Sequence, residues 1–277
     1  MTNGAMRIGF DRMIESAPPV IGTIARTPGY GTRHGAPIRI VRLPIACDTH
    51  AAAPRWSFDG TALTFDAPGV ARYRCTPNAI APLPPAPDTP SDMVEALLVA
   101  TALPASLWLD GAFMLHASAV VPAGETVALV IAGRSGSGKS RLAAALLARG
   151  ARLVADDSVA IRGDRCSGLA GGYHLGAPGE ARAFHPVAHG CASARLGAIL
   201  VLDDIAAPVR VRGVEAVAML LAHRHRANAA RHAGLEPRAL ADAARLARDV
   251  AICRWPRNDA DALLDDAVRA SVMGEDR

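Results

Sequence analysis

One stretch of this chain constrains its fold and its chemistry more than any other, namely residues 127–150, which read VALVIAGRSGSGKSRLAAALLARG. An apolar run typical of a β-strand ends at Gly133, and an Ala- and Leu-rich helical pattern follows Lys139 directly. Between them stands Gly-x-x-x-x-Gly-Lys-Ser, the phosphate-binding loop pattern in its expected context of strand, loop and helix. The stretch therefore predicts a site that binds the phosphates of a nucleotide.

Each part of this loop has a chemical role in the prediction. Glycines let backbone N–H groups fold around an anion without Cβ clashes, and the helix that follows directs its positive end at the same phosphate. Lys139 would reach the β- and γ-phosphate oxygens, and the Ser140 hydroxyl would ligate Mg²⁺. The residues predicted to bind the nucleotide are Gly133, Arg134, Ser135, Gly136, Ser137, Gly138, Lys139, Ser140 and Arg141.

Lys139 is also the only lysine in the chain, because the other members of the Lys+Arg count of 30 are all arginine. A chain that otherwise uses arginine for positive charge keeps lysine at the position where a phosphate needs a compact ammonium group on a flexible stem. The alternative interpretation, a single lysine surviving by chance, requires a coincidence of position. The loop is therefore predicted to bind a nucleotide.

Composition limits the classes of protein to consider. The 277 residues are 51% hydrophobic and 20% charged, which is typical of a globular chain with a real core. A net charge of +4 fits an anionic substrate, but without an aromatic platform it predicts no nucleic-acid partner. The absence of a long apolar run predicts no membrane span. Widely spaced cysteines, odd in number, predict reduced thiols and a cytoplasmic location: Cys47, Cys75, Cys166, Cys191 and Cys253.

Two parts of the chain differ in pattern. After a lead-in with one short helix predicted around Phe10 to Ser16, short alternating runs indicate an antiparallel β-region, with a hairpin signal at Asp59-Gly60. A proline-rich linker, 82–90, closes it. The predicted domains are a β-rich accessory region, 1–90, and a P-loop catalytic domain, 91–277.

Within the second part, Ser91 is predicted to cap a helix that runs past Leu103. A strand at 113–121, a turn at Pro122–Gly124 and the P-loop strand indicate a hairpin that leads into the loop. Later segments are predicted from their periodicity and glycine content. They are a loop at 168–179, a buried strand at 198–202, helices at 214–231, 237–248 and 258–272, and a strand at 250–253.

Two adjacent carboxylates, Asp156 and Asp157, end the strand predicted after the loop helix. Phosphoryl transfer needs a metal ion and a group that orients the attacking hydroxyl. One carboxylate would hold Mg²⁺ beside Ser140 and the other would accept the hydroxyl proton, and the residues alone leave open which does which. Neighbouring strand residues point to opposite faces, so a bulge or turn must bring both to the site. A simple acidic turn is the alternative interpretation.

Three stretches together resemble the catalytic domain of HPr kinase/phosphorylase: His116-Ala-Ser-Ala-Val, the loop 133–140, and Leu-Val-Ala-Asp-Asp at 153–157. The likeness is close over residues 113–161 and loose over 195–270. It implies an α/β fold similar to phosphoenolpyruvate carboxykinase, in which a mixed β-sheet with flanking helices carries the P-loop. That fold accounts for a hairpin before the loop.

The resemblance also implies roles for individual residues. ATP would lie in the loop with Lys139 at its phosphates, and Ser140 with Asp156 would bind Mg²⁺. Asp157 would be the general base and His116 would lie near the transferred phosphate. The division of roles between the two aspartates stays open, and His116 has the alternative of a core histidine with satisfied hydrogen bonds.

Departures from the family pattern bear on the substrate. The family's second glycine-rich signature is not recognisable near Glu180, the hairpin is slightly longer, and the N-terminal β-region differs from that of the bifunctional enzyme. The layout is more similar to HPr-kinase-related proteins that tailor lasso peptides. The resemblance therefore implies an ATP/Mg²⁺-dependent kinase acting on a Ser or Thr hydroxyl of a peptide or protein, with a homo-oligomer possible. HPr itself, a small molecule, and a non-catalytic ATP sensor are the alternatives.

Three weaker motifs complete the candidates. His185, His189 and Cys191 invite a metal interpretation, but Pro186 argues against a shared helix face, so a loop is preferred. The stretch 223–232 predicts a basic helical face, either solvated or facing a phosphate or an acidic peptide. Asp203-Asp204 is interpreted as a turn rather than a second metal-binding acid pair.

Overall fold

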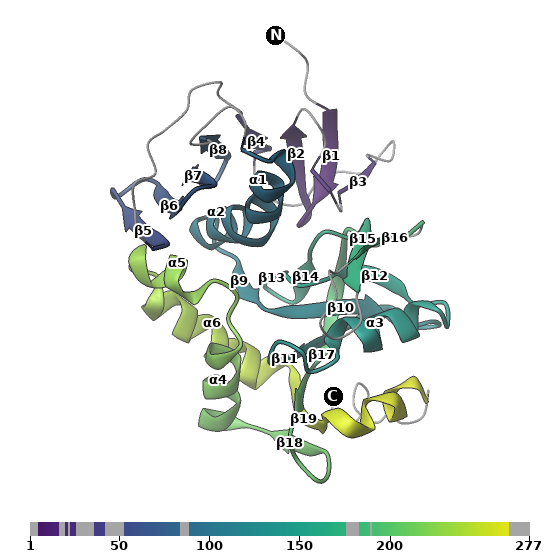
Figure 1. The fold of residues 1–277 in the computed structure, drawn as a ribbon. Helices are drawn as coiled ribbons and strands as arrows, with labels where there is room; N and C mark the ends of the chain where they lie inside the picture. Colours follow the sequence, from purple (N-terminus) through teal and green to yellow (C-terminus); the bar gives the residue numbers. More distant parts are fainter. Residues whose placement is uncertain are drawn as a thin grey trace.

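The computed structural model describes residues 5–16, 20–21, 23–25, 36–41, 53–83, 89–175, 183–188 and 190–265. Over this part of the chain the fold is α/β, with two large mixed sheets and a small two-stranded one (Figure 1). The strands are β1 (Ala5–Gly9), β2 (Arg12–Ser16), β3 (Ile24–Ala25), β4 (Ile38–Ile40), β5 (Arg55–Phe58), β6 (Leu63–Ala67), β7 (Ala71–Cys75), β8 (Ala79–Leu83), β9 (Phe113–Leu115), β10 (Ala117–Val121), β11 (Val127–Gly133), β12 (Arg152–Ala155), β13 (Val159–Arg162), β14 (Arg165–Ser167), β15 (Gly172–Leu175), β16 (Ala183–Pro186), β17 (Ser193–Asp203), β18 (Val209–Val211) and β19 (Ala251–Pro256). The helices are α1 (Ser91–Leu97), the π-helical η1 (Leu98–Ala102), α2 (Leu103–Leu109), α3 (Lys139–Leu147), α4 (Gly213–Ala222), α5 (Ala227–His232), α6 (Glu236–Asp249) and the 3₁₀ segment η2 (Arg257–Leu264).

The N-terminal sheet has the strand order β3-β1-β2-β4-β8-β7-β6-β5. The short helix predicted around Phe10 to Ser16 is wrong, because β1 and β2 form an antiparallel hairpin that pairs Gly9 with Arg12. Phe10 and Asp11 both have a φ of 56°, as a two-residue turn of the primed type requires. Phe-Asp lacks the Asn-Gly or Asp-Gly chemistry that announces such a turn, so the sequence gives no hairpin signal there.

The hairpin predicted at Asp59-Gly60 is confirmed, between β5 and β6. Its loop has four residues, since Phe58 pairs with Leu63. The Asp59 carboxylate accepts hydrogen bonds from the N–H groups of Thr61 and Ala62, at 2.8 and 2.7 Å. An aspartate that bonds the backbone ahead of it stabilises a turn locally, so this hairpin could be predicted from sequence.

The second large sheet carries the P-loop strand, in the order β12-β10-β11-β17-β14-β13-β9, with β19 also beside β17. Strand β11 pairs antiparallel with β10 and parallel with β17, so the sheet is mixed, as the predicted hairpin required. Six of the seven β11 residues are buried. Hydrophobic residues on both faces explain why the sequence shows an apolar run rather than an alternation.

Helices α1 and α2, joined by η1, lie between the two large sheets (Figure 1). The predicted cap at Ser91 is wrong: Pro90 occupies the cap position, without a side-chain hydrogen bond. By length and composition the run Ser91–Leu109 could span a membrane, and half of its apolar window is buried inside the fold. Leu103, Leu107 and Trp108 are fully buried, which identifies a core helix of this fold.

The C-terminal helices depart from prediction at one point that matters for the site. The helix predicted at 214–231 is interrupted after Ala222 and resumes at Ala227, and Arg226 between them has a φ of 52°. Instead of continuing the helix, this segment pairs its main chain with the end of β9. The His116 N–H donates to the His223 carbonyl, and the His225 N–H donates to the Met114 carbonyl. Helix α6 and strand β19 confirm the predictions for 237–248 and 250–253.

Two other segments also differ from prediction. Part of the predicted loop 168–179 is strand β15, which pairs with β16, and residues 176–179 lie outside the described residues. The predicted helix 258–272 is a 3₁₀ segment up to Leu264, and residues 266–272 lie outside the described part. The four described cysteines are free thiols, and Cys47 lies outside the described residues.

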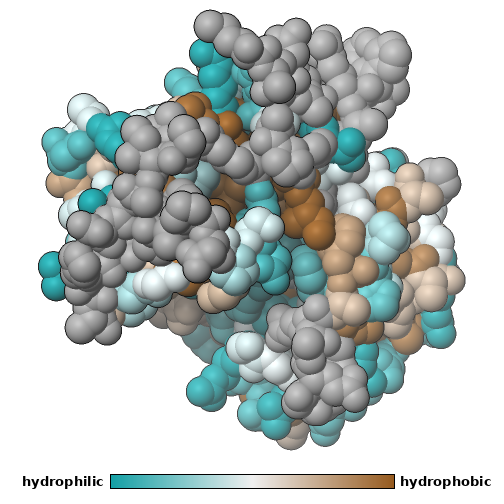
Figure 2. Space-filling model, turned by 45° about the horizontal axis from the view of Figure 1, so that its top comes forward, coloured by the Kyte–Doolittle hydropathy of each residue, from teal (hydrophilic) through white to brown (hydrophobic). Residues whose placement is uncertain are grey.

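On the face that Figure 2 shows, hydrophobic atoms emerge in separate areas among hydrophilic ones. The large hydrophobic side chains that are exposed come from different elements, and Val214 in α4 is the most exposed of them at 86%. Scattered exposed hydrophobic residues are normal for a folded chain and need no partner to explain them.

One hydrophobic cluster runs from the N-terminal sheet through α2 into β9 and β13. A buried ion network follows the same path. The guanidinium of Arg12, which is fully buried, contacts the carboxylate of Asp110 at the end of α2, and Arg162 of β13 bonds the same carboxylate at 2.5 Å. Arg12 also donates to Asn78 Oδ1 at 3.0 Å. The division into domains at residue 90 stays a prediction.

Replacing Arg12 should therefore destabilise the whole fold. We expect Arg12→Met to lower the free energy of unfolding by about 3–5 kcal/mol, because the change leaves buried acceptors without their donor. Urea unfolding measures the effect. The matched control is Arg39→Met, whose side chain is 70% exposed and pairs with Glu15 at 3.2 Å. That surface pair should contribute about 0–1 kcal/mol, and an equal loss in both variants would contradict the prediction.

Candidate functional site

The phosphate-binding pattern forms the turn between β11 and α3, as the sequence predicts. Gly136 and Gly138 have φ values of 79° and 96°, in the left-handed region that favours glycine. A Cβ on Gly133 would lie 2.6 Å from Ser137 Oγ and 2.9 Å from the Leu202 carbonyl oxygen. The loop therefore has backbone conformations and close contacts that glycine alone satisfies.

The interior of this loop fits an anion. Lys139 is 7% exposed, and its ammonium group donates to the carbonyls of Gly133 and Arg134, each at 3.0 Å. Helix α3 starts without a side-chain cap, so its first N–H groups are available to an anionic ligand. The buried Ser137 Oγ has no hydrogen-bond partner among the described residues. These donors match the phosphate chain of a nucleotide.

The other predicted loop residues differ in surroundings. Arg134, Ser135 and Gly136 are exposed at the tip of the loop. Arg141, in the first turn of α3, pairs with Asp261 of η2 at 3.3 Å, and both side chains are 64% exposed. Its role in nucleotide binding stays a prediction.

Asp156 lies against the loop helix. Its Oδ1 accepts hydrogen bonds from Ser140 Oγ at 2.9 Å and from Ser118 Oγ at 2.7 Å. Its Oδ2 accepts the backbone N–H of His174 at 3.0 Å. The structure thus brings together Ser140 and Asp156, the two residues predicted to bind Mg²⁺.

Asp157 faces a different neighbour because the chain turns sharply at this residue. Its φ is 68°, and the Ser158 N–H donates to the Asp156 carbonyl at 2.9 Å, which closes a three-residue turn. A non-glycine residue in the left-handed region is uncommon and concentrates at functional sites. The turn is the distortion that two adjacent acids at one site require.

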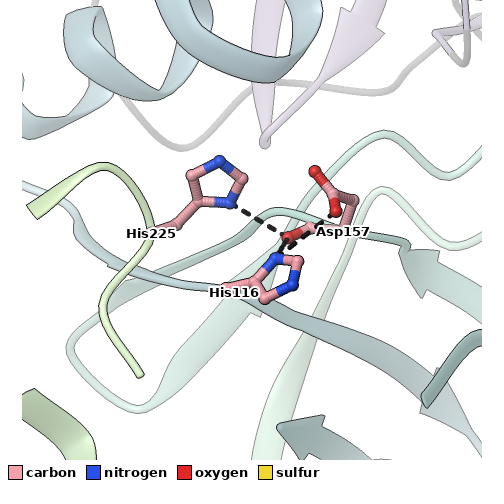
Figure 3. A group of neighbouring side chains, drawn as sticks. All are labelled: His116, Asp157 and His225. Carbon is pink, nitrogen blue, oxygen red and sulfur yellow. Dashed lines mark hydrogen bonds and ion pairs between the residues drawn. The ribbon is translucent and has the colours of Figure 1, made fainter. Parts of the chain in front are cut away.

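His116, between β9 and β10, contacts Asp157 twice (Figure 3). Its Nδ1 lies 3.3 Å from Asp157 Oδ1 and 3.1 Å from the Asp157 carbonyl oxygen. His225 approaches the same carbonyl from the loop between α4 and α5, with its Nδ1 at 3.0 Å. The two imidazole rings meet edge to face, with centroids 5.4 Å apart. The main chain and side chain of Asp157 are thus held by histidines.

Burial and neighbouring positive charge lower the pKa of the histidines around Asp157. Burial is the largest cause that lowers the pKa of His116, and the Lys139 charge lowers it further, against the opposing effect of Asp157. The pKa of His223 is lowered for the same two reasons, burial first and Lys139 second. A neutral His116 can orient the Asp157 carboxylate without neutralising it.

Metal binding can be tested against the ligand chemistry. Among the described residues, the ligand atoms of His116, Asp157 and His225 lie within 4.8 Å of one another. The His225 nitrogens are already engaged, with Nε2 lying 3.0 Å from the Ala100 carbonyl. Mg²⁺ prefers oxygen ligands, and the hydroxyl of Ser140 beside the carboxylate of Asp156 supplies them. The predicted magnesium ligands therefore fit that ion.

The remaining motifs lie as follows. Asp203 and Asp204 pair with Arg254 and Arg257, at 2.9 and 2.5 Å, as expected for an acidic turn rather than a metal site. His185 stacks on Tyr173 in the two-stranded sheet, and His189 lies outside the described residues.

Three contacts of the site were missed at the level of sequence. Ser118 stands two residues after His116, a spacing that could have placed both on one face of a strand. His174 donates its backbone N–H and leaves no side-chain signal. His225 belongs to a stretch predicted as a helical face, so its place beside Asp157 could not be anticipated.

Comparison with known proteins gives little further information. No family model matches the chain, and no curated protein matches it. One solved structure that matches is the HPr(Ser) kinase/phosphatase from Coxiella burnetii, with 17% identity. The match covers 57% of this chain and 95% of that chain, with a TM-score of 0.37. A match at that score is too weak to assign a function to this chain.

The loop glycines give a test of the site's geometry. Gly133→Ala should destabilise the fold more than Gly136→Ala, by about 1–3 kcal/mol, because only the first Cβ meets neighbouring atoms. The φ of Gly133, 145°, is also less accessible to alanine than the 79° of Gly136, so backbone strain adds to the packing cost in the same direction. Chemical unfolding of the two variants measures it, and equal losses would show that the loop is looser than described.

One buried and two half-buried histidines predict how stability depends on pH. Burial places the pKa of His116, His223 and His225 below the ordinary value of 6.5. Between the folded and unfolded pKa values the unfolded chain binds more protons, so the free energy of unfolding falls as pH drops through this window. We expect the urea midpoint to decrease from about pH 7 to about pH 5.5, since unfolded histidine titrates in this range. In His223→Gln the decrease should be smaller, and an unchanged slope would contradict the prediction.

Proposed function

We propose that this protein is an ATP- and Mg²⁺-dependent kinase that phosphorylates a Ser or Thr hydroxyl of a peptide or protein. The observation that carries the proposal is the division of the acid pair. Asp156 bonds the hydroxyl of Ser140 at 2.9 Å, whereas a left-handed turn directs Asp157 to His116. A nucleotide-binding protein would need the first of these contacts, and the second provides the oriented carboxylate that a general base requires.

The proposed reaction assigns one task to each group. Backbone N–H groups of the loop and the Lys139 ammonium bind the phosphates of ATP. Ser140 and Asp156 would hold Mg²⁺, which neutralises phosphate charge when bound. Asp157 takes the proton of the acceptor hydroxyl while that oxygen bonds to the γ-phosphorus and the bond to the β-phosphate oxygen breaks. His116 orients the Asp157 carboxylate, and ADP and a phosphate ester leave.

The acceptor class rests on the resemblance in sequence. The stretch around His116 and the β-rich N-terminal region are similar in layout to kinases that tailor lasso peptides. We therefore propose a ribosomally made precursor peptide with an accessible serine as the acceptor. The HPr(Ser) kinase/phosphatase of Coxiella burnetii, by its name, acts on HPr, which makes HPr the natural comparison substrate.

Two substitutions test the catalytic roles. Lys139→Ala should abolish transfer, because nothing else in the loop supplies a compact ammonium to the phosphates. Asp157→Asn should lower kcat by about 10²–10⁴-fold while the KM for ATP stays unchanged, as expected for loss of a general base. Asp261→Asn, 64% exposed in its pair with Arg141, is the matched control and should keep full activity. Undiminished kcat in Asp157→Asn would exclude that residue as the base.

The acceptor is tested by mass. Purified protein is incubated with ATP and Mg²⁺ and, in separate reactions, with a serine-ended peptide, with HPr or with a pool of metabolites. We expect one added phosphate on the peptide alone. Transfer to a metabolite would replace the acceptor class, and ATP binding without transfer to any of the three would favour a nucleotide-sensing regulator.

A further inference from the structure

The helix between the two large sheets contains a proline where its backbone pattern changes. Pro104 follows η1, the five-residue π-helical segment Leu98–Ala102, and lies at the start of α2. In an α-helix the N–H of residue 104 would bond the carbonyl of Ala100, four residues earlier. Proline has no N–H, and its ring crowds that carbonyl. The Ala100 carbonyl is therefore deprived of its α-helical donor.

Two side chains from the loop after α4 bond this carbonyl oxygen. His225 Nε2 lies 3.0 Å from it, and Arg226 Nε donates to it at 2.6 Å. Because a carbonyl oxygen only accepts, His225 must carry a proton on Nε2. Local π-helical geometry in an α-helix is frequent at functional sites, and here it presents a main-chain acceptor to a second segment.

The other side of the His225 ring faces the acidic turn. With its proton on Nε2, the neutral ring accepts at Nδ1, so the Ser158 hydroxyl donates to Nδ1 at 3.1 Å. The Asp157 carbonyl oxygen lies 3.0 Å from the same nitrogen, and the ring reaches the acidic turn through Ser158. The ring is 5% exposed and bridges the helix to the turn that aims the Asp157 carboxylate. Trp108 of α2 adds a hydrogen bond to the His225 carbonyl at 2.8 Å, so the ring has little freedom to move.

We propose that the Ala100 carbonyl, exposed by Pro104, anchors His225 and Arg226 and thereby positions Asp157 for proton transfer. His225 is then a positioning residue, since it acts on Asp157 and not on the substrate. The same carbonyl also holds the Nε of Arg226. The left-handed backbone of Arg226 turns the chain into α5. This inference rests on the proposed kinase function for its effect on activity, but its structural part can be measured separately.

Pro104→Ala is the decisive variant. It restores an N–H that competes with His225 and Arg226 for the Ala100 carbonyl, and it removes no side-chain contact to the site. Alanine suits a helix better than proline, and this gain offsets the packing lost with the buried Pro104 ring, so the thermal midpoint should change little. We nevertheless expect kcat to fall by about ten- to a hundred-fold with the KM for ATP unchanged, because a small misplacement of a catalytic group is costly.

Controls separate positioning from general damage. Pro237→Ala is a control at the first turn of α6, where a backbone N–H has no carbonyl of its own helix to bond. It should leave kcat unchanged. His225→Phe keeps an aromatic ring without nitrogens and should lower kcat at least as much as Pro104→Ala. The double variant should be no worse than His225→Phe alone, since both changes break the same link.

The ring of His225 gives a readout that needs no phosphate transfer. In the nitrogen-15 NMR spectrum the Nε2 proton should exchange slowly in the wild type, and its signal should shift or broaden in Pro104→Ala. One outcome is that the wild type transfers no phosphate while its Nε2 signal still shifts or broadens in Pro104→Ala. In that case the kinase proposal fails, and the proposed hydrogen bond between His225 and the Ala100 carbonyl is supported. If the wild type is active and Pro104→Ala keeps its kcat and its ring signal, the anchor is overturned and the kinase proposal stands.

Discussion

The carboxylate of Asp156 is the contact on which the rest of the site depends. It accepts hydrogen bonds from Ser140 in α3, Ser118 in β10 and the backbone of His174 in β15. Three separate elements therefore converge on one side chain at the end of an edge strand. Bonds to a charged acceptor are stronger than neutral ones, so this junction fixes the loop helix against the sheet. A phosphate-binding loop needs such fixation, because its anion contacts come mainly from backbone groups that must already be in place.

The turn at Asp157 follows from that fixation. With Asp156 committed to the loop helix, the next residue of an extended strand would point to the opposite face. A left-handed φ of 68° keeps Asp157 at the same edge, at a local cost of the order of 1–3 kcal/mol. The contact of His116 with the Asp157 carbonyl, at 3.1 Å, and that of the Ser158 hydroxyl with His225 Nδ1, at 3.1 Å, offset part of this cost. Two carboxylates of identical chemistry thereby obtain different neighbours and can take different roles.

Local patterns in the sequence predicted the parts of the fold that local interactions determine. The glycines and the single lysine identified the loop, and the apolar spacing of α6 identified that helix almost to its ends. The hairpin at Phe10 and Asp11 could not be predicted, because its positive φ values are held by packing rather than by turn residues. The break after Ala222 could not be predicted either, because the sequence around His225 is compatible with a helix. Hydrogen bonds between its main chain and the end of β9 replace the helical ones. Asp156 and Ser140 were predicted together because both belong to the P-loop motif and its neighbouring strand. The link between His225 and Asp157 depends on tertiary contacts between distant segments and was not predicted.

The N-terminal sheet has a part in this arrangement although its inventory of catalytic side chains is poor. Arg12 holds Asp110 at the end of α2, and Ser106 in the same helix bonds the Thr76 carbonyl at 2.6 Å. Tyr73 of β7 donates to the Val94 carbonyl in α1 at 2.8 Å. These contacts determine where the helical segment lies, and with it the Ala100 carbonyl that His225 meets. The β-rich region therefore supports the site by fixing the position of one helical segment. This role requires a rigid sheet but no catalytic side chains.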